Sequence, residues 1–326
     1  WNGAMTAGVA NSAFVPTYLK KSGYNTANWI GLAKAVSQAN GLPKESIIAY
    51  GDWAALVCAR LGGNVIVLQH KGQDVLVPLV DEAQLKVNPY LQGSPILFPA
   101  NRTNFAKFTF EGKDYTLPLN EDWSQCHIHG FVHTRPFTLV EHKENEVTMK
   151  LVYDKIDEGF PFMCEVWVTY TLDERGFTQS YVIKNIDTRN LPVVFCMHST
   201  FVEPEEFILP ISLRQERVDG RATGKYVLLG PREKKYVTGS PSKGVNVDGY
   251  YLASGRETQI GDYLYSVSEQ FDHWVLYNGR GKGGFICIEP QAGMVNGLNY
   301  AAPEGHRVLE PGKTIDFSAT VSYNKR

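Results

Sequence analysis

Beyond residue 45, the apolar positions follow the two-residue period of β-strands. Residues 165–171 place Val166, Val168 and Tyr170 on one face, as in a strand with one buried side. Similar runs recur to the end of the chain, separated by turn-forming pairs such as Asn278-Gly279. The pattern predicts strands at residues 54–59, 64–69, 74–79, 107–110, 137–141, 146–153, 164–172, 177–184, 191–197, 263–267, 273–277, 285–289 and 314–322.

Helical spacing is confined to the beginning of the chain, where apolar residues from Trp29 to Leu42 recur at helical intervals. Residues 1–45 are expected to form an N-terminal extension with one helix, packed on a main domain of residues 46–326. Many strands with almost no helices between them predict an all-β fold for this domain, a large antiparallel β-sandwich with few short helices. Residues 204–262, rich in Gly and Pro, are expected to form long loops with short strands.

Composition narrows the range of partners and compartments. The chain has 326 residues with 32 Lys and Arg against 34 Asp and Glu, and no basic stripe, which argues against nucleic acid. No run of 18 apolar residues is present, so we expect no membrane span. The five cysteines are widely spread, which suggests reduced, buried thiols and favours the cytoplasm. The chain begins at Trp1, so export with a removed signal peptide stays open.

One predicted strand, residues 285–289, carries a carboxylate at its end. Glu289 follows an apolar run and precedes Pro290, so we expect the chain to leave the sheet there. A carboxylate in that position can line a cleft and act as a general base. A solvent-facing Glu at a strand end is the commoner alternative.

Three of the eight histidines lie within seven residues: His127, His129 and His133. On a strand, His127 and His129 would direct both rings to one face, which is a metal-binding geometry. A metal-binding cupin would also need a carboxylate a few residues later, but the nearest, Glu141, follows His129 by twelve residues. The alternatives are a single histidine that serves a polar cleft, or three structural histidines.

Two further residues have side chains suited to a polar cleft. An apolar run, residues 192–197, ends at His198, and an imidazole is the natural acid near neutral pH. Arg102 lies between two apolar segments, and its guanidinium can donate five hydrogen bonds to sugar hydroxyls or a carboxylate. A core histidine and a surface arginine are the structural alternatives.

The order of these motifs resembles the aldose 1-epimerase (galactose mutarotase) family. The likeness covers roughly residues 46–326, and the family fold is a single large β-sandwich. The matching segments are residues 62–64, 72–76, 93–102, 108–117, 120, 129–130, 168–172, 185, 192–201 and 288–290.

The resemblance implies roles for four residues. Glu289 matches the glutamate that takes the proton from the C1 hydroxyl of the sugar, and His198 the histidine that protonates the ring oxygen. His129 matches a second cleft histidine and Arg102 a substrate-binding arginine. The implied substrate is a monosaccharide, a hexose or modified hexose, and no metal or organic cofactor is required. We expect a monomer or homodimer.

Other positions leave alternatives open. For the family's substrate-binding aspartate, Asp262 fits best and Asp272 is the alternative, and His127 is a further binding candidate. Phe131 and Met197 replace a Gly and an Asn of the galactose-type enzymes, so the resemblance leaves the sugar open. A non-catalytic carbohydrate-binding protein on the same fold, and a cupin-like metalloprotein, are the rival hypotheses.

Overall fold

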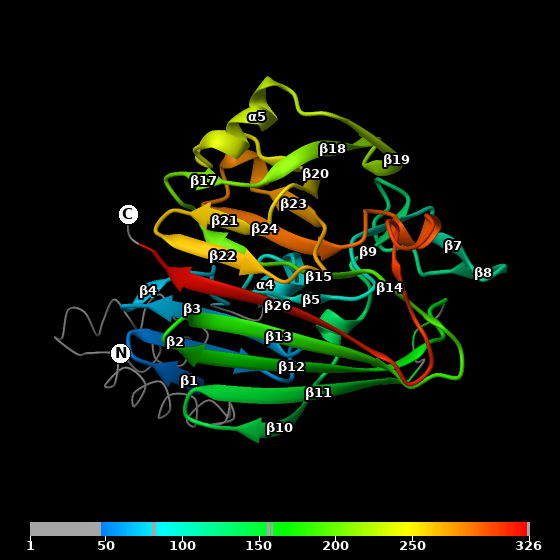
Figure 1. The fold of residues 1–326 in the computed structure, drawn as a ribbon, viewed down its shortest axis with the longest axis horizontal. Helices are drawn as coiled ribbons and strands as arrows, with labels where there is room; N and C mark the ends of the chain where they lie inside the picture. Colours follow the sequence, from blue (N-terminus) through cyan, green and yellow to red (C-terminus); the bar gives the residue numbers. More distant parts are fainter. Residues whose placement is uncertain (1–46, 80–82, 155–156, 158, 325–326) are drawn as a thin grey trace.

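The computed structural model of the chain describes residues 47–79, 83–154, 157 and 159–324 (Figure 1). The predicted N-terminal extension, residues 1–45, lies outside the described residues. In the described part, strands dominate and two large sheets form the body of the molecule (Figure 1). The prediction of an all-β fold is confirmed.

Each of the two large sheets has eight strands. The first sheet contains, in spatial order, β10 (Thr138–His142), β11 (Glu146–Asp154), β12 (Met163–Asp173), β13 (Gly176–Asn185), β26 (Thr314–Tyr323), β22 (Tyr263–Val267), β21 (Glu257–Ile260) and β17 (Phe207–Ile208). The second contains β19 (Arg221–Leu228), β18 (Ile211–Val218), β20 (Asp248–Ala253), β23 (His273–Tyr277), β24 (Phe285–Ala292), β15 (Phe195–Met197) and β5 (Ile96–Leu97), with β16 (Thr200–Val202) also paired to β24.

Smaller units surround these sheets. A four-stranded sheet contains β1 (Ile47–Tyr50), β2 (Trp53–Cys58), β3 (Asn64–His70) and β4 (Gln73–Asp74). Three strand pairs are β14 (Leu191–Val193) with β25 (Arg307–Leu309), β6 (Arg102–Asn104) with β9 (Cys126–Ile128), and β7 (Lys107–Phe110) with β8 (Lys113–Thr116). The described helices are α4 (Ala83–Val87), α5 (Pro231–Thr238) and the 3₁₀ turns η2 (Val132–Thr134), η3 (Gly279–Gly281) and η4 (Gly297–Asn299). None of these helices is long and apolar enough to cross a membrane.

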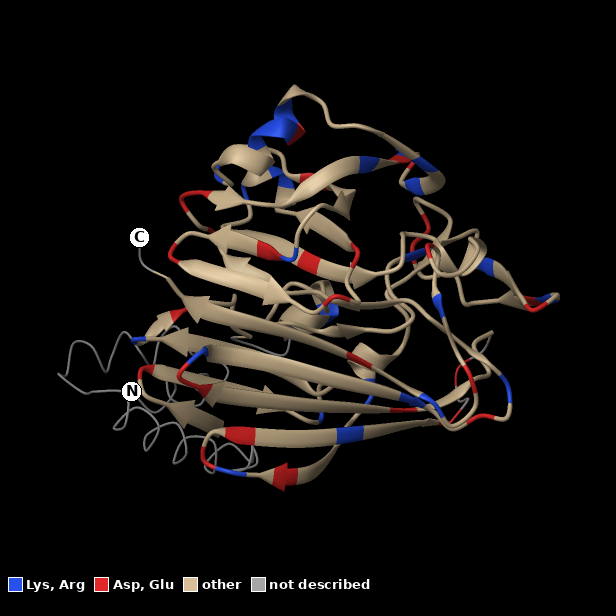
Figure 2. Cartoon of the chain, in the orientation of Figure 1, with Lys and Arg blue, Asp and Glu red and all other residues tan. Residues whose placement is uncertain are grey.

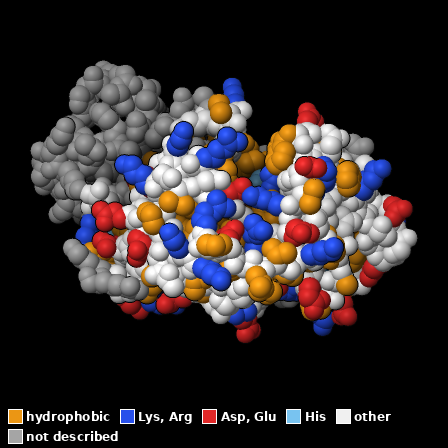
Figure 3. Space-filling model, turned by 90° about the horizontal axis from the view of Figure 1, so that it is seen from above, with side chains coloured by type: hydrophobic (Ala, Val, Ile, Leu, Met, Phe, Trp, Pro, Cys, Tyr) orange, Lys and Arg blue, Asp and Glu red, His pale blue; other side chains and the backbone are white. Residues whose placement is uncertain are grey.

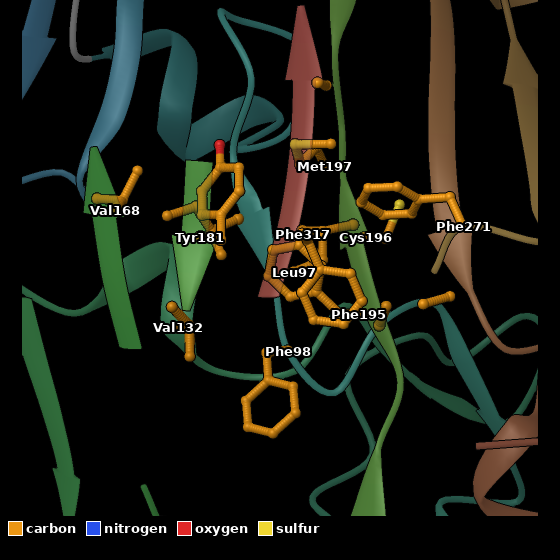
Figure 4. Close-up of a cluster of buried hydrophobic side chains, with 14 of the residues drawn as sticks. Leu97, Phe98, Val132, Val168, Tyr181, Phe195, Cys196, Met197, Phe271 and Phe317 are labelled. Carbon is orange, nitrogen blue, oxygen red and sulfur yellow. The ribbon is translucent and has the colours of Figure 1, made fainter. Parts of the chain in front are cut away.

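The core joins the two large sheets through aromatic side chains (Figure 4). Phe195 of the second sheet stacks on Phe317 of the first at 4.5 Å between ring centroids, and its ring lies 5.2 Å from that of Tyr181. All three side chains are buried. Burying an aromatic side chain stabilises a fold by roughly 1.5–3 kcal/mol, so this contact fixes where β15 lies against the first sheet.

Three predicted strands differ from the structure. Of the predicted strand 74–79 only Asp74 lies in a strand, at the end of β4, because the following residues pass over Phe201, with which Leu76 forms a single bridge. Residues 191–197 form two strands, β14 and β15, which pair in different sheets. Residues 204–262 are more ordered than expected, since β18 and β19 each extend over eight residues.

The prediction that the chain leaves the sheet at Glu289 was wrong. Strand β24 continues through Pro290 to Ala292, and all eight of its residues are buried. The neighbouring chain is interrupted there, because β15 pairs only as far as Cys196 and β16 begins at Thr200. Pro290 lacks an N–H and therefore fits inside a strand at a place where the ladder on one side is broken.

The state of the cysteines matches the expectation of reduced, buried thiols. All five cysteines are buried and none forms a disulfide, as predicted.

Acidic and basic residues are interspersed across strands and loops, and basic residues gather on α5 (Figure 2). Seen from above, Lys and Arg side chains lie scattered among acidic and hydrophobic ones (Figure 3).

Candidate active site

Strand β24 has two chemically different faces. Ile286 and Ile288 point into the main core between the sheets. By strand alternation Glu289 and Gln291 share the opposite face, where Glu289 lies in register with Val275 of β23. The carboxylate therefore emerges from the middle of a rigid sheet, on the side away from the main core.

The break between β15 and β16 directs His198 toward this carboxylate. Nε2 of His198 lies 3.4 Å from Oε1 of Glu289, and the two side chains are 6% and 2% exposed. The backbone N–H of His198 donates to the carbonyl of Pro95, which fixes the chain at the break. An imidazole and a carboxyl group thus face each other where both are shielded from solvent.

Burial determines where the protons of this pair reside. Burial, with a smaller contribution from Asp248, raises the pKa of Glu289 to about 8, although Arg102 and Cys196 oppose the shift. Burial, together with His133, lowers the pKa of His198 to about 4. Between these values the pair holds one proton, which burial favours on Glu289. Transfer across the 3.4 Å contact gives the form with the proton on His198 and a carboxylate at Glu289. Such a pair can accept one proton from a bound molecule and donate another.

Arg102 extends from β6 to the same face. Its guanidinium donates two parallel hydrogen bonds of 2.6 Å to the carboxylate of Glu121 and a third, short one to the hydroxyl of Tyr250. Tyr250 is in register with Val275, one strand further from Glu289. Arg102 is therefore held in a fixed geometry. It is close enough for its charge to oppose part of the rise in the pKa of Glu289.

Tyr90 and three histidines form a cluster of rings beside the Glu289 carboxylate. The ring of Tyr90 lies 4.4 Å from that of His129, 5.1 Å from His133 and 5.9 Å from His198, and the His129 and His198 rings are 5.3 Å apart. Burial, followed by the effects of His198 and Arg102, lowers the pKa of His129 well below its usual value. These imidazoles are neutral near pH 7 and can accept or donate single hydrogen bonds.

A left-handed backbone brings His129 into the site. His129 has φ 68° and its N–H donates to the carbonyl of Asn101, which itself has φ 58°. Gly130 follows with φ 61°, and a Cβ there would collide with the backbone of Phe98 and Pro99. Such backbone conformations cost free energy in non-glycine residues and cluster at functional sites.

A further carboxylate, Asp248, lies at the start of β20 on the Glu289 face. Asp248 is in register with Tyr277 of β23, which is in turn in register with Cys287 of β24. The charge of Asp248 contributes to the raised pKa of Glu289. Its two oxygens accept hydrogen bonds from Arg217, one of them at 2.9 Å. Sequence reasoning missed Asp248 because strand β20 lies in the segment predicted to be mostly loops.

A sequence profile described as aldose 1-epimerase matches residues 51–232, more than half of the chain. The chain belongs to the aldose 1-epimerase family. Galactose mutarotase of Rattus norvegicus is 34% identical over 138 residues, which are 41% of this chain and 38% of the rat protein. The uncharacterized protein YihR of Escherichia coli K12 is 27% identical over 153 residues, 46% of this chain and 48% of YihR. The chain thus matches less than half the length of these relatives.

Solved structures share the aldose 1-epimerase fold with this chain. A galactose mutarotase-like protein from Clostridium acetobutylicum superposes with a TM-score of 0.79 at 20% identity, over 86% of this chain and 95% of that one. Galactose 1-epimerase from Lactobacillus acidophilus superposes with a TM-score of 0.70 at 14% identity, over 85% and 92%. The predicted β-sandwich of the family is confirmed.

The structure does not bring together every residue that the family resemblance suggested. Asp262 lies in the turn between β21 and β22 of the first sheet, where it lines a cavity of about 380 Å³ that also contains Glu203. Asp272 precedes β23, and its oxygens accept hydrogen bonds from His273, Arg307 and the N–H of Gly293. Asp262 therefore lies on the other large sheet from Glu289, and the acceptor atoms of Asp272 are already engaged.

The local backbone does not favour the metal-binding alternative for His127 and His129. Strand β9 ends at Ile128, and the left-handed φ of His129 breaks the alternation that would place both rings on one face. His127 is buried beside Phe131, and its Nδ1 is 2.7 Å from the carbonyl oxygen of Pro118. Within the described ranges, no hydrogen bond or ion pair joins His127 to Glu289 or His198.

A different trio has metal-binding potential. Among the described residues, His198, Cys287 and Glu289 each offer a ligand atom, and these atoms all lie within 4.8 Å of one another. The sulfur of Cys196 is 3.9 Å from Oε2 of Glu289. No sequence motif indicated that Cys287 joins His198 and Glu289, because Cys287 and His198 are brought together only by the pairing of β16 with β24.

Proposed function

We propose that this chain is an aldose 1-epimerase that interconverts the α and β anomers of a free aldose without a cofactor. The observation that carries the proposal is the buried pair of Glu289 and His198, whose Oε1 and Nε2 atoms are 3.4 Å apart. Glu289 is assigned as the base for the C1 hydroxyl and His198 as the acid for the ring oxygen. Membership in the aldose 1-epimerase family supports this assignment.

The chemistry requires one proton to be removed and another to be delivered. Opening a cyclic hemiacetal removes the proton from the C1 hydroxyl, protonates the ring oxygen and leaves an aldehyde. Rotation about the C1–C2 bond and reclosure, with the roles reversed, give the other anomer. A pair that holds one proton ends the cycle with its proton count unchanged. Acid–base assistance of this kind is worth about 10²–10⁴-fold per partner.

The surrounding groups suit the binding of a polar ring. Arg102 and His129 provide hydrogen-bonding groups beside the pair, and the bidentate contact with Glu121 holds the guanidinium in place. Burial removes water that would compete for the sugar hydroxyls and strengthens each hydrogen bond. We assign Arg102 and His129 to substrate binding.

Charge favours an uncharged sugar over a phosphorylated one. Arg102 is paired with Glu121, and Arg217, which lies over the ring of Tyr250, is paired with Asp248. A phosphate group entering the site would have to displace a carboxylate from either arginine, and would approach other carboxylates. Sugar hydroxyls need no such exchange, because they can hydrogen-bond to the paired groups as they stand.

NMR measurement of anomer exchange tests the proposal. Purified protein should accelerate the exchange of at least one free aldose in a panel of hexoses, deoxyhexoses and pentoses, and should leave the matching 6-phosphates near the rate in buffer. Binding of a sugar with exchange at the buffer rate throughout the panel would contradict the proposal and support the non-catalytic carbohydrate-binding hypothesis. Faster exchange of the 6-phosphate than of the free sugar would contradict the charge argument alone.

A further inference from the structure

The residues proposed for proton transfer also form part of an unassigned set of metal ligands. His198, Cys287 and Glu289 supply nitrogen, sulfur and oxygen ligand atoms within 4.8 Å of one another, and all three residues are buried. Strand β24 carries Cys287 and Glu289 on one face, and His198 lies at the break in the neighbouring chain. Sheet pairing fixes the backbone of Cys287 and Glu289, and the hydrogen bond from the His198 N–H to the carbonyl of Pro95 fixes that of His198, so the three ligands are already in place before any ion arrives.

The distance between the nitrogen and oxygen ligand atoms matches a tetrahedral ion. With bonds of about 2.0–2.2 Å from zinc to nitrogen and oxygen, two such ligands at a tetrahedral angle lie about 3.4 Å apart. The Nε2–Oε1 distance between His198 and Glu289 is 3.4 Å. Nδ1 of His198 has no hydrogen-bond partner among the described residues. The ring can therefore carry its proton on Nδ1 and leave the lone pair of Nε2 free to bind an ion.

The donor types select the class of ion. Imidazole, thiolate and carboxylate together suit Zn²⁺ and Co²⁺, whereas Mg²⁺ and Ca²⁺ prefer oxygen ligands alone. The hydroxyl of Thr200 lies 3.5 Å from the sulfur of Cys287 and can donate to a thiolate. The sulfur of Cys196, 3.9 Å from Oε2 of Glu289, adds a second soft atom at the edge of the group. Three protein ligands leave one position for water.

We propose that His198, Cys287 and Glu289 form a binding site for a thiophilic divalent cation such as Zn²⁺, and that the bound ion blocks sugar turnover. An ion at this point occupies both the carboxylate and the imidazole, so neither can exchange a proton with a sugar. The inhibitory part of this inference rests on the proposed function, whereas metal binding itself does not. The effect of metal is opposite to that in a metalloenzyme, since removal of the ion should restore activity.

Cobalt binding tests the site without any assay of activity. Full-length protein stripped with a chelator should bind one Co²⁺ and develop the near-ultraviolet absorption of a cobalt–thiolate bond. Loss of a hydrogen-bonding residue behind a ligand weakens metal binding about 10–100-fold, so loss of a direct ligand in Cys287→Ser should weaken it at least as much. Cys164→Ser is the matched control, because Cys164 is an equally buried thiol in β12. Cys287→Ala provides a second variant if the serine variant does not fold.

Two results would overturn the site: no thiolate absorption in the wild type, or an unchanged absorption in a folded Cys287 variant. In the activity arm, Zn²⁺ should inhibit anomer exchange by the wild type and the Cys164→Ser control, and a chelator should reverse the inhibition. Exchange by the Cys287 variant should resist Zn²⁺. Exchange that requires added metal would contradict both inhibition and the cofactor-independent mechanism. A cobalt–thiolate signal without any exchange activity would uphold the metal site and refute the proposed function.

Discussion

At the scale of single residues, the buried carboxyl group of Glu289 makes stability depend on pH. Its pKa is raised from 4.5 to about 8, mainly by burial, so the folded protein keeps a proton that the unfolded chain releases above pH 4.5. The stabilising contribution of this group is complete below pH 4.5 and is lost as pH rises through 8. The full shift corresponds to a loss on the order of 5 kcal/mol.

The first prediction concerns Glu289→Gln, which replaces the carboxyl group with a neutral one of the same shape. The variant should be more stable than the wild type at pH 9, with an advantage that shrinks toward pH 5. Urea unfolding at both pH values measures this difference. Glu233→Gln is the matched control: Glu233 is also buried, but it is ion-paired with Arg214, so its replacement should bring no gain at pH 9. An advantage of Glu289→Gln that did not grow with pH would contradict the assigned protonation.

The second prediction is a bell-shaped dependence of kcat/KM on pH. The active pair of Glu289 and His198 holds one proton, which it loses above the raised pKa of about 8. A second proton is added below the lowered pKa of His198, about 4. Stopped-flow polarimetry or NMR exchange should therefore show activity that falls on both sides of this range. Activity that continued to rise beyond pH 9 would mean that a proton-free pair is the active form.

At the scale of elements, the site depends on irregular backbone between regular strands. His198 lies where β15 ends and before β16 begins, and His129 follows the last residue of β9 in a left-handed conformation. Sheet pairing fixes the strands on either side of each break, so the functional side chains leave the sheet at defined points. The rigid strands therefore position residues that are themselves outside the ladder.

The third prediction tests one of these breaks through Gly130→Ala. The variant combines a left-handed φ with a collision against the backbone of Phe98, so we expect a loss of at least about 3 kcal/mol in unfolding free energy and reduced exchange through displacement of His129. Gly112→Ala is the matched control, since Gly112 also has a positive φ but no atom lies within 4 Å of its added Cβ. It should lose only about 1 kcal/mol and keep its activity. Equal losses in the two variants would contradict the steric argument.

The sequence was a good guide to long alternating strands and a poor one to short ones. Strands β12, β13 and β11 were predicted nearly to their ends, because each buries one face over eight or more residues. Strands such as β6 and β9 were missed, since three residues carry no readable period and form only by pairing with distant segments. The local pattern also failed at Pro290. A proline usually ends a strand because it has no N–H for the ladder, but the neighbouring chain is interrupted at this point, so β24 continues.

At the scale of the whole molecule, one core holds the two sheets and leaves the outer face of the second sheet for chemistry. Phe195 anchors β15 against Phe317 of the first sheet, three residues before His198. The family resemblance indicated Glu289, His198, His129 and Arg102, which the structure gathers on this face. It could not indicate Cys287 or Asp248, since their proximity to Glu289 follows from sheet register rather than from local sequence.

The central claim is that Glu289 and His198 exchange protons with a bound sugar, and anomer exchange by NMR in single variants tests it most directly. Glu289→Gln and His198→Asn should each slow exchange of the preferred aldose by at least about 100-fold while the protein stays folded. Glu233→Gln and His306→Asn, which alter a buried glutamate and a buried histidine on other elements, should exchange near the wild-type rate. Wild-type exchange in a folded Glu289→Gln or His198→Asn variant would contradict the account.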